Sequence, residues 1–105
     1  MILRRHGRFD ELVARQLDLL AADDADLLAE ATEAEAAWRR APREEAEEAY
    51  GDFQLVLDAI GDRLLDIRET YVATLEDDAA ADYRAAFTRA AGKRFGHAAT
   101  VLADE

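Results

Sequence analysis

Apolar residues recur along the central part of the chain at alternating intervals of four and three positions. Starting from Ala46, the recurring residues are Ala46, Tyr50, Phe53, Leu57, Ile60, Leu64, Ile67 and Tyr71. This spacing matches the helical repeat of about 3.6 residues, whereas a half-buried strand would alternate at every second residue. The phase passes Gly51 and Gly61 unbroken, so neither glycine marks a turn. The pattern predicts one helix over about residues 42–76, with Pro42 in its first turn.

A second run with the same spacing precedes this helix. Its members are Val13, Leu17, Leu20, Asp24, Leu27, Ala31, Ala34 and Trp38, and they predict a helix over about residues 9–40. One member is an acid, so Ala22–Asp26 could instead break the helix, with an aspartate capping a new one. The connection through Ala41 and Pro42 allows only a tight reversal. The two helices are therefore expected to lie antiparallel, with Asp24 facing Asp58 and Trp38 anchoring the end of the hairpin.

The remainder of the chain predicts one more helix and a tail. Asp77 and Asp78 are candidate N-caps for a helix over about residues 78–95, and Gly92 or Gly96 is its stop signal. Residues 97–105 are expected to form a partly ordered tail. The predicted fold class is all-α, with a long antiparallel helical hairpin and a shorter third helix in one domain of residues 1–96.

The central helix carries a second stripe that its own chain is not expected to cover. The interface candidates on this stripe are Gly51, Leu55, Gly61, Leu65, Val72 and Leu75. A glycine inside a helix costs about 1 kcal/mol relative to alanine, which is understandable where another backbone approaches closely. Because the third helix is too short to cover the whole stripe, we expect a second copy of the chain to do so. The result would be a homodimeric helical bundle.

Charge narrows the classes of partner. The chain of 105 residues has a formal net charge of −11, and residues 10–82 hold 22 acids against six arginines. The basic residues near both ends are too few to form a phosphate-binding surface, and the negative field disfavours anionic lipid surfaces. The basic residues after position 83 are expected to favour a helix C-terminus or to neutralise acidic neighbours. We therefore expect no nucleic-acid partner, no membrane contact and a cytoplasmic location.

Candidate chemistry is limited to carboxylates. The sequence contains no cysteine and no serine, which removes disulfides, thiolate metal sites and the usual nucleophiles. His6 and His97 lie near opposite ends of the chain and are expected to be solvated. No residue is assigned to catalysis, to a cofactor or to a metal. The expected function is that of a non-enzymatic interaction protein, an adaptor, small accessory subunit or regulator that acts through homodimerisation and an acidic surface.

One alternative uses the carboxylates of the helices. Glu44-Glu45-Ala46-Glu47-Glu48 followed by Asp52, with Glu30 and Glu33 as an upstream pair, resembles the pattern of all-α nucleotide pyrophosphohydrolases. In that family Glu-Glu-x-x-Glu and Glu-x-x-Asp hold Mg²⁺, so the resemblance implies a Mg²⁺-dependent enzyme. The chain departs from the pattern at Ala49, where the family has an acid. Asp24 and Asp58 are added because they are expected to face each other. The candidate carboxylates are Asp24, Glu30, Glu33, Glu48, Asp52 and Asp58.

Overall fold

The regular structure of this protein is helical. The computed structural model describes residues 7–103, and no strand occurs within that range. The elements are α1 (Asp10–Asp23), α2 (Ala25–Arg40), η1 (Arg43–Glu45), α3 (Ala46–Val72), α4 (Asp77–Phe95), η2 (Gly96–Ala99) and α5 (Thr100–Ala103), where η denotes a 3₁₀-helix. The prediction of an all-α fold is confirmed.

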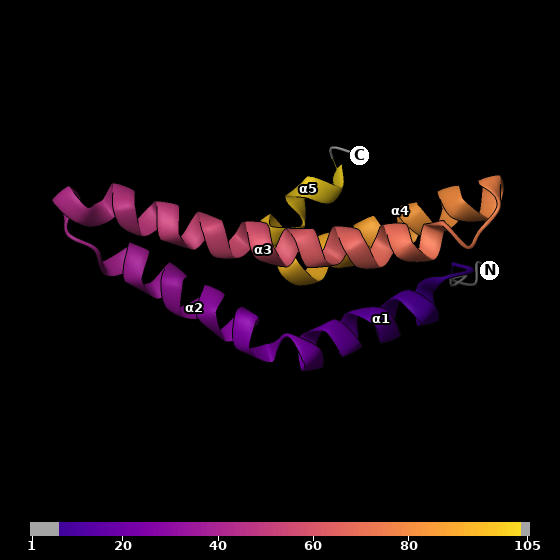
Figure 1. Cartoon of the computed structure of the whole chain (residues 1–105), viewed down its shortest axis with the longest axis horizontal. Coiled ribbons are helices and arrows are strands. Elements are labelled where there is room, and N and C mark those ends of the chain that lie inside the picture. The colour runs from indigo at the N-terminus through magenta and orange to yellow at the C-terminus, as the bar shows by residue number, and fades with distance from the viewer. Residues whose placement is uncertain (1–6, 104–105) are drawn as a thin grey trace, which may run out of the picture.

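The long helix α3 lies at the centre of an elongated molecule of 53 × 35 × 25 Å. Figure 1 shows α1 and α2 as the two limbs of a wide V beneath α3. Helix α2 runs back along the first half of α3, α4 lies along its second half, and α5 returns to its middle. One end of the molecule is therefore several helices thick, whereas the other consists of α2 and α3.

The vertex of the V is at Asp24, and the predicted single helix over residues 9–40 is wrong. The alternative, a break within Ala22–Asp26, is the one observed. The side chain of Asp24 makes no capping hydrogen bond to α2. Its backbone keeps two helical hydrogen bonds, because its N–H donates to the Leu20 carbonyl at 2.8 Å and its carbonyl accepts from Leu28 N–H at 3.0 Å. The chain thus bends without unravelling, and the bend lets α1 pack against α4.

The core lies where α1, α4 and the second half of α3 meet. Its largest apolar members are Val13, Leu17, Leu20, Ile60, Leu64, Tyr83, Phe87 and, from α5, Leu102. The ring of Tyr83 lies within 6 Å of the rings of Phe9, Tyr71 and Phe87. Its hydroxyl donates a hydrogen bond to Gln16 Oε1 at 2.7 Å, and burial raises the pKa of Tyr83 to about 12. The one deeply buried tyrosine is therefore neutral and satisfied on its polar side.

The C-terminal segment is folded, so the prediction of a partly ordered tail is wrong for residues 97–103; residues 104 and 105 lie outside the described part. Gly96, at φ +55°, ends α4 and turns the chain back. A positive φ of this kind favours glycine, which has no Cβ to clash. Beyond it, η2 and α5 pack onto α3 and bury three apolar side chains, those of Ala98, Ala99 and Leu102.

This segment makes the close approach that the sequence predicts at Gly61. A Cβ built on Gly61 would lie 2.8 Å from the Ala98 carbonyl oxygen and 3.1 Å from Val101 Cγ1. The backbone that approaches Gly61 therefore belongs to the same chain, not to a second copy. Gly51 has no neighbouring atom within 4 Å of such a Cβ.

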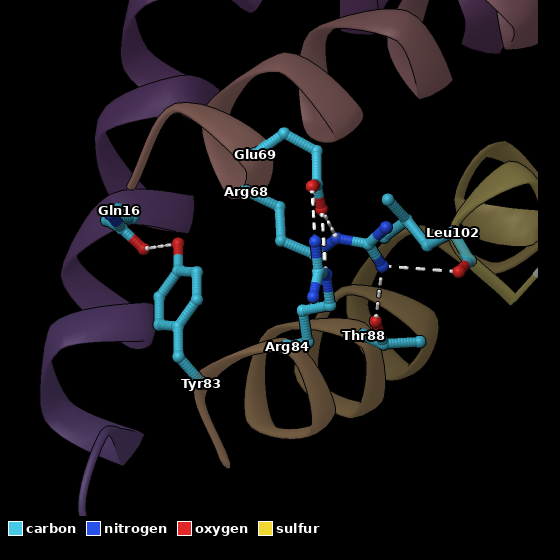
Figure 2. A network of polar contacts seen from close by, with 7 residues as sticks. All are labelled: Gln16, Arg68, Glu69, Tyr83, Arg84, Thr88 and Leu102. Carbon is cyan, nitrogen blue, oxygen red and sulfur yellow. Dashed lines mark hydrogen bonds and ion pairs between the residues drawn. The ribbon is translucent and has the colours of Figure 1, made fainter. Parts of the chain in front are cut away.

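A buried arginine links three helices (Figure 2). Arg68 of α3 is 1% exposed, and its Nε donates to Glu69 Oε2 at 2.8 Å. Its Nη1 donates to Thr88 Oγ1 of α4 at 2.8 Å and to the Leu102 carbonyl of α5 at 3.2 Å. The other terminal nitrogen, Nη2, is buried and has no hydrogen-bond partner within residues 7–103. Glu69 also accepts two hydrogen bonds from Arg84 of α4, at 2.7 and 3.2 Å.

The two helical glycines form a matched pair for mutation. Gly61→Ala is expected to lower the free energy of unfolding by roughly 1–3 kcal/mol, because its methyl group meets a backbone carbonyl that cannot rotate away. Gly51→Ala, in open space, should raise it by up to about 1 kcal/mol through helix propensity. Urea denaturation of both variants measures the difference. Equal stabilisation by the two alanines would contradict the contact at Gly61.

The network around Glu69 predicts a pH dependence of stability. Its hydrogen bond with Arg84, and next the one with Arg68, lower the pKa of Glu69 below its ordinary 4.5, against the opposing effect of partial burial. A carboxylate with a lowered folded-state pKa stabilises the fold fully above pH 4.5 and loses this contribution as the pH falls through the folded-state value. Glu69→Gln should therefore be less stable than the parent at neutral pH, and the gap should narrow below pH 4.5.

Urea denaturation of the parent and of Glu69→Gln across this pH range tests the expectation, with the exposed Glu76→Gln as control. A gap that is the same in acid as at neutral pH would show that the Glu69 charge does not stabilise the fold.

Candidate functional site

The half of the molecule that contains α2 buries the fewest side chains. We call α2, η1 and residues 46–58 of α3 the arm; it forms the end of Figure 1 at which α2 turns into α3. Helix α2 has no buried residue, and it packs mainly on α3. At the tip the ring of Trp38 lies 5.0 Å from that of Tyr50 and 5.9 Å from that of Phe53. The prediction that Trp38 anchors this end is confirmed.

A groove of about 840 Å³ runs between α2 and α3 on one face of the arm. We call it the arm groove. Small apolar side chains, among them Ala37 and Ala49, line it together with Leu55, whose exposed fraction of 68% is the highest of any large apolar residue described. Its charged lining residues are Glu30, Glu33, Arg40 and Asp52. Both the apolar surface and the charges of this groove are open to solvent.

The predicted interface stripe on α3 is divided between three environments. Gly51 and Leu55 are exposed on the arm, whereas Gly61 is buried under the C-terminal segment of its own chain. Leu65, Val72 and Leu75 are half-buried and pack against the core. Besides α4, the segments η2 and α5 of the same chain pack on α3, and they cover this stripe at Gly61. What remains open is its start.

The predicted carboxylates do not converge on one point. Glu30, Glu33 and Asp52 line the arm groove, while Glu48 is exposed outside it. Asp58 accepts a hydrogen bond from Gln54 Nε2 at 3.1 Å and borders a different groove, of about 460 Å³, next to Gly61. Within residues 7–103, no three histidine, cysteine or carboxylate side chains are grouped closely enough to hold a metal ion.

Asp24 faces an arginine rather than Asp58, and the predicted register is wrong. Its Oδ2 accepts a hydrogen bond from Arg63 Nε at 2.9 Å. The reversal uses an extended stretch at Ala41 and Pro42 followed by the turn of η1, so α3 starts later than expected. Each residue of α2 therefore faces a later position of α3 than predicted, as Asp24 does with Arg63 in place of Asp58. The hydrogen bond with Asp24, and next its negative charge, raise the pKa of Arg63 above its already high ordinary value.

Several other charges form ion pairs between helices. Arg94 near the end of α4 binds Asp18 of α1 at 2.6 Å, and Arg84 binds Glu69 as described. The expectation that basic residues of this segment neutralise acidic neighbours is confirmed for these two. His97 is exposed, and His6 lies outside the described residues.

Arg40, which is not among the site residues predicted from sequence, also lines the groove. The signal was present, since Glu30, Glu33, Ala37 and Arg40 follow one another at intervals of three, four and three, which places them on one face of α2. Only their proximity to Asp52 and Leu55 of α3 shows that this face borders a groove.

Comparisons with known proteins found no matching family model, no similar curated protein and no similar solved structure. None of the helices within residues 7–103 has the length and apolar character needed to cross a bilayer.

The ion pair at the bend is open to a direct test. Because the side chain of Arg63 is 43% exposed, solvent screens the pair, and we expect a coupling free energy of about 0.5–1 kcal/mol between Asp24→Asn and Arg63→Gln. Asp66 is the control, since its Oδ2 lies 3.8 Å from Arg63 Nη1 and its side chain is 71% exposed. Its coupling to Arg63 should be near zero. Urea denaturation of the single and double variants gives both values, and equal couplings would contradict the assignment of Asp24.

Proposed function

We propose that this protein is a non-enzymatic interaction protein, a homodimeric helical bundle that serves as an adaptor, a small accessory subunit or a regulator. The exposed apolar surface of the arm is the observation that supports this proposal. Its helix α2 buries no residue fully, and Leu55 and Tyr50 on the facing helix are 68% and 45% exposed. A pair of helices with this much open apolar surface is typical of an element that is completed by another molecule.

The charge of the chain supports the same proposal. A net charge of −11 keeps the protein soluble and makes association with other acidic surfaces unfavourable unless specific contacts offset the repulsion. A partner protein would therefore present basic side chains to this surface, as electrostatic complementarity requires. In a dimer, the helices of the two arms would pack side by side as in a four-helix bundle.

The alternative is a Mg²⁺-dependent enzyme of the nucleotide pyrophosphohydrolase type. The observation in its favour is that Glu30, Glu33 and Asp52, all three taken from the motif resemblance, line the same groove as Arg40. Carboxylates are the ligands that Mg²⁺ uses in proteins, and an arginine suits a phosphate. Against it stand Ala49 in place of the family's acid and the absence, within residues 7–103, of a three-residue cluster able to hold a metal.

The mass of the protein in solution tests the main proposal. Sedimentation equilibrium on the intact chain should give twice the monomer mass of 11.7 kDa at micromolar concentration. In the same experiment series, added Mg²⁺ or Mn²⁺ should leave the melting temperature unchanged, because a ligand raises it only by binding the native state.

A monomer over the whole accessible concentration range would contradict the dimer. A rise in melting temperature with Mg²⁺ that disappears in Glu33→Gln, together with pyrophosphate release from a nucleoside triphosphate, would favour the enzyme instead.

A further inference from the structure

The charges of the arm groove are arranged with a polarity. Glu30 and Glu33 lie towards the bend, whereas Arg40 lies at the tip, seven residues after Glu33 on the same helix. At 1.5 Å per residue this separates the arginine from Glu33 by about 10 Å. The residues between them on this face are alanines, including Ala36 and Ala37. One end of the groove is therefore acidic and the other end carries a cation, while the α2 side of the middle is apolar and Asp52 of α3 also lines the groove.

Two such grooves are complementary in one orientation. If a second copy lies face to face with the first and runs antiparallel to it, the arginine end of each groove meets the glutamate end of the other. A parallel arrangement would instead place α2 of each copy against α3 of the other, so Arg40 would not meet Glu33. A two-fold axis that crosses α2 near Ala36 and Ala37 creates each favourable contact twice, because an isologous interface repeats every contact.

The same two-fold axis brings the exposed Leu55 into the contact between the two copies. Asp24 lies level with Arg63 and Trp38 with Tyr50, so the level of Ala37 on α2 corresponds to that of Gly51 on α3. An axis at this level brings Leu55 of one copy near the small residues around Ala49 of the other. It also brings the two Asp52 side chains towards each other, which is an unfavourable feature that this arrangement alone predicts.

We propose that the arm groove is the homodimer interface, and that two arms dock antiparallel with Arg40 of each copy against Glu33 of the other. This inference rests on the proposed function, since it locates the dimer contact that the function requires. It places the contact on the arm rather than on the α3 stripe around Gly61, which η2 and α5 already cover. The occupant of the groove is a second copy of this chain.

Charge reversal on the intact chain tests the interface. Glu33→Arg and Arg40→Glu should each weaken the dimer by roughly ten-fold or more in Kd, because each places like charges together. The double variant should recover an affinity close to that of the parent. Sedimentation equilibrium measures all of them, and circular dichroism checks that these exposed substitutions leave the helices intact.

The matched controls are Glu35→Arg and Arg39→Glu, which make the same charge changes on a neighbouring pair of α2 that does not line the groove. They should leave Kd within about two-fold of the parent. Asp52→Asn should tighten the dimer, because it removes the repulsion at the axis; a role in folding alone would not move Kd in this direction.

The outcomes separate the two proposals. A parent dimer that is indifferent to Glu33→Arg and Arg40→Glu, or that is not restored by combining them, would overturn the arm interface while leaving a dimeric interaction protein. A parent that is monomeric would overturn both.

Discussion

The guanidinium of Arg68 constrains the C-terminal half of this molecule. It is an ion inside an apolar core, and its three partners come from three different helices: Glu69 from α3, Thr88 from α4 and the Leu102 carbonyl from α5. Removing a charge from water costs several kcal/mol unless its donors are satisfied by partners. The helices must therefore stay in the positions that satisfy the guanidinium. Because Nη2 of Arg68 has no partner within residues 7–103, the guanidinium depends on its other hydrogen bonds to offset the cost of burial.

This constraint explains why the C-terminal segment is folded although it is short. A helix such as α5, Thr100–Ala103, has no stability by itself, since isolated helices shorter than about 12 residues are marginal. It is held by the burial of Ala98, Ala99 and Leu102 and by the hydrogen bond from Arg68. In turn it covers Gly61, where any side chain would collide with its backbone. Gly61 and Arg68 lie seven residues, or about two turns, apart on α3 and serve the same packing arrangement.

The arm is stabilised differently. Its contacts are the aromatic packing of Trp38 on Tyr50 and Phe53 and the half-buried seam between α2 and α3, with no fully buried residue on α2. Local unfolding requires least free energy where few apolar contacts are buried, so the arm is the part whose stability is most sensitive to a bound partner. The bend at Asp24 separates the two regions, because it directs α1 towards α4 and leaves α2 alone on α3. The proposed interface therefore lies in the region where the fewest side chains are buried.

Periodicity alone determined the all-α class and the uninterrupted course of α3 through Gly51 and Gly61, because the phase of apolar residues is a local property of a helix. It also predicted a close backbone contact as the reason for the two glycines, and the structure has this contact at Gly61 but not at Gly51. Only the tertiary structure decided which backbone makes that contact, since Gly61 and Ala98, like Arg68 and Leu102, are far apart in sequence. The register of Asp24 and the joining of Arg40 with Asp52 depended on the length of the reversal, where one short 3₁₀ turn shifts every pairing beyond it. A sequence pattern states which face of a helix is apolar, but which neighbour covers that face is settled by packing and by the cost of burying charge.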